Sequence, residues 1–403
     1  MYLENLILTL LICAVWAYPA PTAAEESIHD SSIRFLEQRL SEDPDDFLAH
    51  AHLSTAYLKK SSSSGDLALI TKAKTRAESS IQLAFGKDRI PGFLALGQAN
   101  LQLHHFREAL ESASDVLAIS PKSPPALELT FDALIELGQL DKATETLKKI
   151  KAQGVQGVPL WARESRLAEL KGQYEKAIER LSEAAKKDQN LLIRYGEICF
   201  RYGRLKVART AFEEALAYGN QWAALEHLAE VQAAEAQWDL ALTNLTAAIK
   251  LAPERPELYQ TMGDIYVFRG DVKSAAPFFQ EAKRLYENSI AAGNDHFLHH
   301  LSGFYADSLP DAQLAHQFAK MDLLLRQGAY ANDTLAWALF KEGQTEIAKI
   351  TIGKALSTGL QDPHVLYHAG LIYSLSGNFQ EGQNLLKKAE SINPYFMAFH
   401  AHR

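Results

Sequence analysis

A small residue recurs along this 403-residue chain at intervals of mostly 31 to 34 residues. Around each copy, apolar residues are spaced three and four residues apart, which is the spacing of one face of an α-helix. A helical unit of this length cannot bury its apolar face alone, so the repeat predicts a stack of similar units around one continuous core. The ten small residues are Ala73, Ala109, Ala143, Ala177, Ala208, Ala241, Ala275, Ala315, Ala348 and Gly382.

Residues 255–285 show the predicted unit most clearly. Leu258 and Met262 lie on one face of a first helix, and Gly270 ends that helix because glycine readily adopts the left-handed conformation. Asp271 can then cap a second helix, so we expect each unit to be a helical hairpin. The equivalent turn glycines are Gly138, Gly172, Gly203, Gly270, Gly343 and Gly377.

A second small position precedes the first, in most units by 12 residues. Small side chains at both positions let the paired helices approach closely, and Phe131 is the one large residue among them. The second set is Ser54, Gly97, Phe131, Ser165, Gly196, Ala229, Gly263, Gly303, Ala336 and Gly370. These two positions and the turn glycine resemble the tetratricopeptide repeat (TPR) family. The resemblance implies an all-α fold, a right-handed α-solenoid of about ten TPR helical hairpins whose first helices line a concave groove.

The chain divides into four expected regions. Residues 1–24 are a predicted signal peptide and 25–44 an N-terminal capping helix; TPR repeats 1–7 occupy 45–290, and repeats 8–10 with a C-terminal tail occupy 291–403. The signal is indicated by an apolar run too short to span a membrane, followed by small residues, although no basic residue precedes the run. We therefore expect a secreted or periplasmic protein with no membrane span after signal removal.

Three stretches predict local departures from the regular hairpin. The serine-rich residues 59–66 predict a flexible loop inside the first hairpin. Pro277 is predicted to bend the helix that contains it, because proline lacks the backbone amide. The same helix is predicted to extend beyond Tyr286 until Gly293 and Asn294 break it.

Composition excludes some classes of function. The formal net charge is −8 without long runs of one sign, which argues against a nucleic-acid partner. Common nucleophile, zinc and phosphate-loop motifs are absent from the sequence, so we predict no enzymatic activity and no cofactor. Cys199 is expected to be a buried, inert thiol, and loss of Cys13 with the signal would leave no partner for a disulfide.

Histidines offer a second, weaker hypothesis. His364 and His368 are one helical turn apart, a spacing that can present two imidazoles to one metal ion. No acidic or thiol ligand follows at a fixed offset, so the predicted site contains no metal. A histidine-based metal-handling protein remains an alternative.

The groove is where the resemblance places function, because stacked repeats present variable side chains on a constant frame. Toward the C-terminus its predicted residues become aromatic, and Tyr and Trp are common anchors at interfaces. Packing between neighbouring repeats is the open alternative for these rings. The predicted partner-binding residues are Phe297, His300, Phe304, Tyr330, Asp333, Trp337, Phe340, His364 and Tyr367.

We therefore predict a non-enzymatic scaffold that binds a protein or peptide in its groove. The stretch 333–344 looks like a recurrent ending among exported bacterial repeat proteins, which favours the bacterial periplasm or envelope. The alternatives are a factor for envelope assembly or polysaccharide export that contacts glycan through the aromatic groove, and the metal-handling protein.

Overall fold

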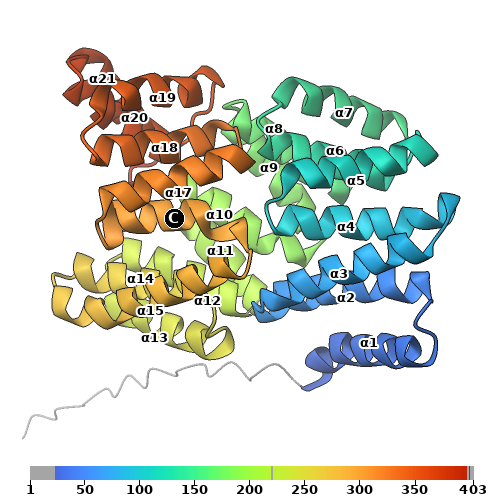
Figure 1. Ribbon diagram of the computed structural model, residues 1–403. Helices are drawn as coiled ribbons and strands as arrows, with labels where there is room; N and C mark the ends of the chain where they lie inside the picture. The colour runs from blue at the N-terminus through green and yellow to red at the C-terminus, as the bar shows by residue number, and fades with distance from the viewer. Residues whose placement is uncertain (1–22, 219–220, 397–398, 400–403) are drawn as a thin grey trace, which may run out of the picture.

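The computed structural model describes residues 23–218, 221–396 and 399, and every regular element in that range is a helix (Figure 1). Residues 1–22 of the predicted signal peptide lie outside it. Helix α1 (Ala23–Glu42) occupies the place of the predicted capping helix and packs on the first hairpin through Ile33 and Leu40. The following helices pair as ten consecutive hairpins, as the sequence pattern predicts.

Each hairpin consists of a first helix and the second helix that packs against it. The first helices are α2 (Phe47–Ser64), α4 (Ile90–Gln102), α6 (Pro124–Glu136), α8 (Val158–Leu170), α10 (Leu192–Arg201), α12 (Gln221–Ala234), α14 (Pro256–Phe268), α16 (Leu298–Gly303), α18 (Ala329–Lys341) and α20 (Pro363–Leu375). The second helices are α3 (Ala68–Leu83), α5 (Phe106–Ile119), α7 (Leu140–Ala152), α9 (Tyr174–Ala185), α11 (Leu205–Leu216), α13 (Trp238–Leu251), α15 (Val272–Ala291), α17 (Ala312–Leu325), α19 (Thr345–Ser357) and α21 (Phe379–Ile392). Short helices η1 (Gly86–Arg89), η2 (Gln189–Leu191) and η3 (Asp295–Phe297) precede α4, α10 and α16, and a π-helix, η4 (Phe304–Ser308), follows α16.

Small residues sit where the paired helices cross, as predicted. An added Cβ at Gly263 would overlap the ring of Phe279, and one at Gly196 would overlap the ring of Phe212. The crossing alanines are fully buried, so the helices pack at interior density with no room for a larger side chain. Phe131, the large exception, is buried in the core that repeats 3 and 4 share with repeats 9 and 10.

The predicted flexible loop at residues 59–66 is wrong, because α2 continues as helix to Ser64 before Gly65 ends it. The serine hydroxyls donate back to carbonyls one turn earlier, Ser62 Oγ to Leu58 O at 3.1 Å and Ser64 Oγ to Lys60 O at 2.8 Å. The polar side chains are thereby satisfied within the helix. Helix α15, in contrast, extends to Ala291 as predicted and contains Pro277.

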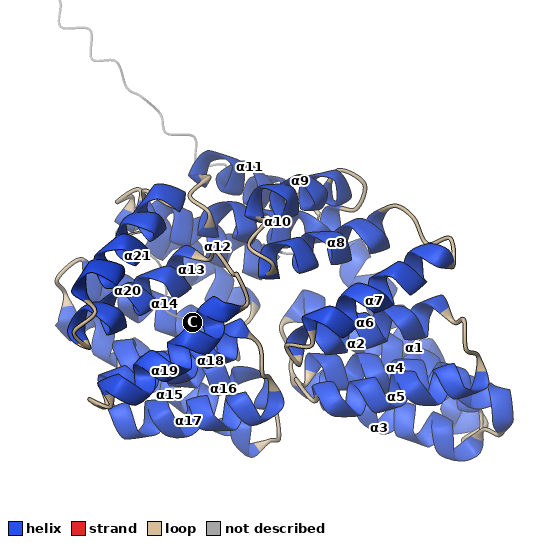
Figure 2. Cartoon of the chain, turned by 90° about the horizontal axis from the view of Figure 1, so that it is seen from above, coloured by secondary structure: helices blue, strands red, loops and turns tan. Residues whose placement is uncertain are grey.

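The repeats curve until the first five lie against the last five. In Figure 2, helices α1–α7 form one lobe and α12–α21 another, and α8–α11 join them along one side. The turns inside repeats 1–5 face the connections that follow repeats 6–10. We call these five the docked turns. They are centred on Gly65, His104, Gly138, Gly172 and Gly203.

Each docked turn lies against a different connection. The backbones are so close that glycine leaves no room for a side chain. A Cβ atom added at Gly138 would lie 2.9 Å from the Gln327 carbonyl oxygen, and a Cβ atom added at Gly172 would overlap the Gly359 carbonyl oxygen. At Gly203 the contact is with Asn393, whose Nδ2 donates to the Arg201 carbonyl at 3.0 Å. The inner surface is therefore enclosed by the chain itself.

Candidate functional site

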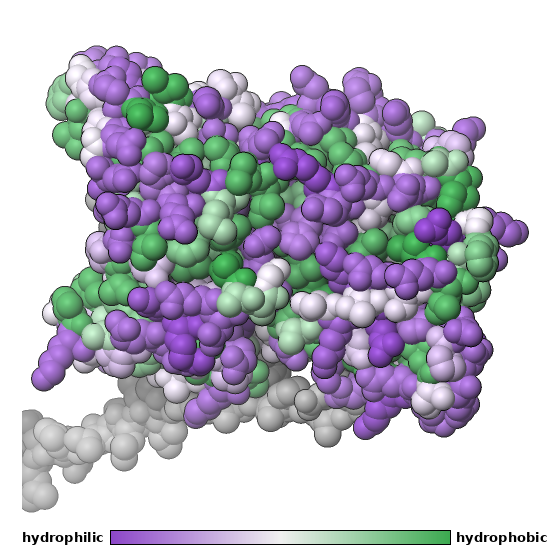
Figure 3. All heavy atoms as spheres, in the orientation of Figure 1, coloured by the Kyte–Doolittle hydropathy of each residue, from purple (hydrophilic) through white to green (hydrophobic). Residues whose placement is uncertain are grey.

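A pocket of about 420 Å³ lies where the inner surfaces of repeats 4–6 and 8–10 face each other. Its walls are the first helices α8, α10 and α12 on one side and α16, α18 and α20 on the other, so first helices line the inner surface, as the resemblance implies. Residues 393–396 and Phe399, which we call the C-terminal segment, complete the lining. The outer face in Figure 3 is mostly hydrophilic with scattered apolar residues, so the pocket is the better-defined site.

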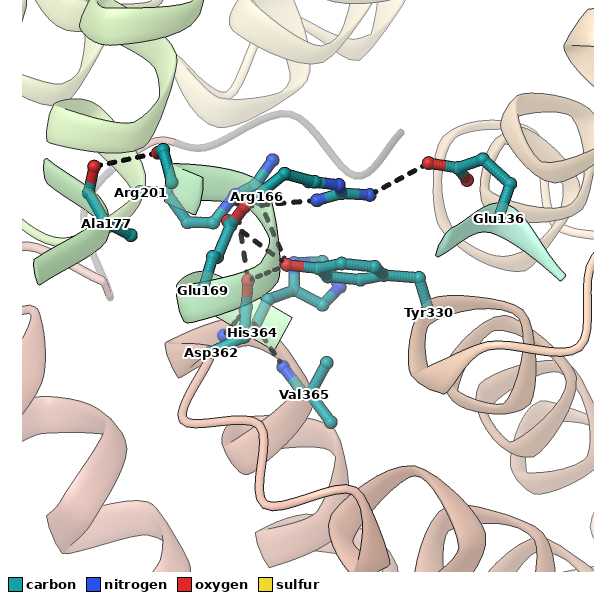
Figure 4. Close-up of polar contacts among 10 residues, drawn as sticks. Glu136, Arg166, Glu169, Ala177, Arg201, Tyr330, Asp362, His364 and Val365 are labelled. Atoms are coloured by element: carbon teal, nitrogen blue, oxygen red, sulfur yellow. Dashed lines mark hydrogen bonds and ion pairs between the residues drawn. The ribbon is translucent and has the colours of Figure 1, made fainter. Parts of the chain in front are cut away.

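A buried polar network crosses the pocket (Figure 4). Glu169 on α8, only 4% exposed, accepts from Arg166 Nη1 at 3.1 Å and from Arg201 Nη1 at 2.7 Å. Tyr330 Oη on α18 donates to Asp362 Oδ2 at 3.1 Å, and Arg201 Nη1 donates to that hydroxyl at 3.1 Å. The network therefore ties repeats 4 and 5 to repeats 9 and 10.

The carboxylates of the pocket differ in their ionisation. Burial disfavours the charged form of Glu169, but Arg201 and Arg166 outweigh it, so the pKa of Glu169 lies below its usual value. Burial dominates at Asp362 and raises its pKa, with Arg201 acting in the opposite direction. Glu197 is only half-buried, and although desolvation raises its pKa, its hydrogen bond to His227 brings the pKa down to about 2.

Among the described residues, every arginine of the pocket has a carboxylate partner. Arg166 pairs with Glu136 as well as Glu169, Arg201 with Glu169 and Asp362, and Arg326 with Asp322. Five other lining residues are acidic: Glu197, Glu230, Asp307, Asp333 and Asp362. The cationic groups are thus neutralised internally, and the lining has an acidic balance.

The C-terminal segment fills one side of the pocket with aromatic rings. Phe396 is 7% exposed and packs against Tyr367, with ring centroids 4.9 Å apart. Phe399 is 2% exposed and packs edge-on against Phe268 at 5.8 Å, inside the core of repeats 6 and 7. Tyr395, the residue before Phe396, stays exposed. A short segment of chain thus spans from repeat 10 to repeats 5–7.

The predicted partner-binding residues separate into two groups. His300, Tyr330, Asp333, Trp337 and His364 line the pocket. Trp337 donates from Nε1 to Asp307 Oδ2 at 2.8 Å and stacks on His368, with centroids 4.0 Å apart. The remaining four, placed elsewhere, are Phe297, Phe304, Phe340 and Tyr367.

Phe297 and Phe304 do not face an open groove, because both are fully buried in a hydrophobic core around Tyr286. Packing between repeats therefore accounts for these two rings. Phe340 is half-buried against Trp337, and Tyr367 contacts the C-terminal segment. Whether any of the nine residues binds a partner stays a prediction.

Histidines gather at two places. The first group surrounds His104, in the docked turn of repeat 2. The distance from His104 Nε2 to His296 Nδ1 is 3.0 Å, and the rings of His299 and His300 lie beside this pair. Burial lowers the pKa of all four, that of His296 to about 3, so this cluster is neutral. The second group is Asp333, His364 and His368, with His368 Nδ1 3.0 Å from Asp333 Oδ1.

Sequence reasoning did not identify the C-terminal segment or the third member of the second histidine group. Tyr395, Phe396 and Phe399 follow the last helix, and aromatic residues beyond the end of a stack are a signal that another surface buries them. Asp333 lies in the preceding repeat, outside the local window in which a partner for His364 and His368 was sought. Cys199 is a buried free thiol as expected, and burial raises its pKa to about 11.

Family models for the tetratricopeptide repeat match residues 100–163, 163–223, 256–289 and 363–396. The chain contains tetratricopeptide repeats. The matched segments cover hairpins in both lobes, and they agree with the recurring small residues and turn glycines. Tetratricopeptide repeats suggest a protein-interaction scaffold.

No curated protein matches the chain. Solved structures similar to this TPR chain include the human IFIT1 dimer with PPP-AAAA, at 14% identity and a TM-score of 0.46, covering 91% of this chain and 94% of that one. The human IFIT1 dimer with m7Gppp-AAAA matches at 12% identity and a TM-score of 0.46, covering 91% and 95%. Among the described helices, none has the length and apolar character needed to cross a membrane.

Proposed function

We propose that this chain is a scaffold that binds an extended segment of a partner protein in the pocket between repeats 4–6 and 8–10. The observation that supports the proposal is the C-terminal segment, which occupies part of that pocket as a bound peptide would. Phe396 and Phe399 supply buried anchors, and Asn393 supplies main-chain recognition through the carbonyl of Arg201. Aromatic anchors with few rotatable bonds are typical of such recognition.

The pocket chemistry favours a peptide over a polyanion. Its arginines already have carboxylate partners, so they are poorly placed to displace counterions from phosphates. We therefore propose that the pocket does not bind nucleic acid. Filter binding with single-stranded RNA and duplex DNA at low salt tests this point, and saturable, salt-sensitive binding would contradict it.

The peptide proposal is tested with a labelled peptide of residues 391–403 added to the full chain. The internal segment competes at an effective concentration on the order of millimolar, so wild-type protein should bind the peptide weakly. In the double variant Phe396→Ala/Phe399→Ala the internal competitor is weakened, since truncating a buried phenylalanine costs about 3–5 kcal/mol. Fluorescence anisotropy should show at least ~10-fold tighter peptide binding to this variant.

The control is Tyr395→Ala, which changes an exposed ring of the same segment, 49% exposed. It should bind the labelled peptide as weakly as wild type. A peptide in which both phenylalanines are alanine should not bind the double variant. Equal binding of the two peptides, or no gain in the double variant, would show that the pocket does not recognise this segment.

We further propose that the protein is exported to a bacterial periplasm or secreted, and that it has no catalytic activity. Support for export comes from the apolar stretch and small residues of the predicted signal peptide, residues 1–24. N-terminal sequencing of the protein recovered from fractionated cells tests the proposal. An intact Met1 on protein in the cytoplasmic fraction would overturn it.

A further inference from the structure

Asp333, His364 and His368 come together from two neighbouring repeats. His364 and His368 are one turn apart on α20, and Asp333 projects from α18. One possible ligand atom from each lies within 4.8 Å of the other two. Asp333 and His368 are 5% and 2% exposed, which separates this group from the acidic clusters common on protein surfaces.

The three side chains are held by the surrounding structure. The His368 ring stacks on Trp337 at 4.0 Å with an interplanar angle of 9°, and the indole is fixed in turn by its bond to Asp307. Asp362 caps α20 by accepting from the His364 amide at 2.8 Å, which sets the backbone below that ring. Ligands oriented by such outer contacts are typical of metal sites.

From this geometry we propose that Asp333, His364 and His368 bind a divalent first-row transition metal ion. Two imidazoles and one carboxylate form a ligand set that suits Zn²⁺ and related ions. All three residues line the pocket, so the ion keeps an open coordination position toward it. The inference is independent of the proposed peptide binding.

The distances fit such an ion with one small movement. A tetrahedral ion with bonds of about 2.0–2.1 Å places its donors roughly 3.4 Å apart. Asp333 and His368 are hydrogen-bonded, with Nδ1 3.0 and 3.2 Å from the two carboxylate oxygens, so an ion would take the place of the shared proton and widen this spacing slightly. His364 is half-buried, with its ring centroid 4.2 Å from that of His368, so the required movement is a rotation of the His364 ring toward the ion.

The local charge also favours a cation. Asp307 and Asp362 also line the pocket, where Asp307 pairs with Lys341 at 3.0 Å and Asp362 with Arg201, so the cationic groups there already have carboxylate partners other than Asp333. The all-histidine cluster around His104 differs, because it has no carboxylate among its four rings. An ion bound there would gain no charge neutralisation, which is why the proposal names the Asp333 group.

The experiment is isothermal titration of the full, tag-free chain with Zn²⁺, with Co²⁺ absorption as a second readout of ligand geometry. The expected result is saturable binding of one ion per chain. His364→Gln or His368→Gln should weaken binding by more than the about 10- to 100-fold that loss of an outer contact costs. Asp333→Asn should weaken it as well while preserving the shape of the side chain.

Two matched variants locate the ion. His104→Asn changes the other histidine cluster and tolerates its left-handed backbone, and His316→Gln changes a histidine that faces a single carboxylate, Glu342. Both should bind Zn²⁺ like wild type. Circular dichroism without metal verifies that each variant is folded. Absence of stoichiometric binding, or binding that His104→Asn abolishes and His364→Gln retains, would overturn the proposal.

Discussion

The turns of repeats 3–5 and those of repeats 7, 9 and 10 look alike in sequence but differ in their surroundings. All six have glycine with φ between 70° and 86° at the same point after the first helix. A Cβ at Gly270, Gly343 or Gly377 would meet nothing within 4 Å. At Gly138, Gly172 or Gly203 it would come within 3 Å of the connection that follows repeat 8, 9 or 10.

The difference shows that one residue type serves two purposes here. In the free turns, glycine only supplies the left-handed backbone that ends a helix. In the docked turns it also allows main chain to approach main chain, which brings the two lobes together. The enclosed pocket therefore depends on contacts between residues far apart in sequence, and three pairs of variants test this comparison.

The largest effect is expected for Gly172→Ala compared with Gly343→Ala. Both introduce a left-handed alanine, which costs about 1–2 kcal/mol. Gly172→Ala adds an overlap with the Gly359 carbonyl, and overpacking costs a further ~1–3 kcal/mol. Chemical denaturation should give a loss of about 2–5 kcal/mol for Gly172→Ala and about 1–2 kcal/mol for Gly343→Ala. Equal losses would mean that the lobes do not hold each other.

A pH effect of intermediate size is expected where the docked turn of repeat 2 meets repeat 8. Burial lowers the pKa of His299 well below its usual value, so the unfolded chain binds the proton first as pH falls. Its contribution to stability is complete above about pH 6.5 and is lost as pH decreases toward the folded pKa. Asp264, whose pKa burial raises to about 7, acts in the opposite direction.

The contribution of Asp264 cancels when wild type is compared with His299→Gln. Between pH 7 and pH 5, wild type should lose about 2 kcal/mol more stability than this variant. His52→Gln, at an exposed histidine, is the control and should follow wild type. Denaturation curves at the two pH values give the answer. If the stability of His299→Gln depends on pH as strongly as that of wild type, His299 is not held neutral in the folded protein.

The smallest effect, and one of opposite sign, is expected in repeat 6. Ala236 adopts φ 60° at a turn where other repeats use glycine. Ala236→Gly removes the cost of a left-handed alanine but adds freedom to the unfolded chain, for a net gain of roughly 0.5–1 kcal/mol. His104→Gly, at the equivalent docked position, should instead destabilise, since it removes the contact with His296. Thermal unfolding of both variants measures whether each is more or less stable than wild type. A less stable Ala236→Gly protein would contradict this prediction.

Local spacing was sufficient to predict the hairpins. The crossing residues and turn glycines depend on neighbours within one repeat, and the pattern identified both. The contacts of Gly138 with Gln327 and of Gly172 with Gly359 could not be predicted in this way. They depend on the curvature of the stack over five repeats, which no single repeat encodes. Phe297 and Phe304 illustrate the consequence for the site: a ring on a first helix faces either the pocket or the next repeat, and sequence periodicity does not distinguish the two.

The second histidine group shows the same limit. His364 and His368 were found by their spacing on one helix, whereas Asp333 depends on the register between two repeats. The predicted loop at residues 59–66 was wrong for a different reason. The serine-rich composition indicated a solvated loop. Serine residues can nevertheless remain in a helix when their hydroxyl groups donate to carbonyls of that helix.

The docking pattern has a consequence for the length of the molecule. The turn of each of the first five repeats meets the connection that follows the repeat five positions later. An open solenoid can gain or lose a unit and keep its nearest-neighbour contacts. Here a unit inserted between the lobes would shift all five contacts out of register at once. The number of repeats that separates two contacting units is therefore fixed by these contacts.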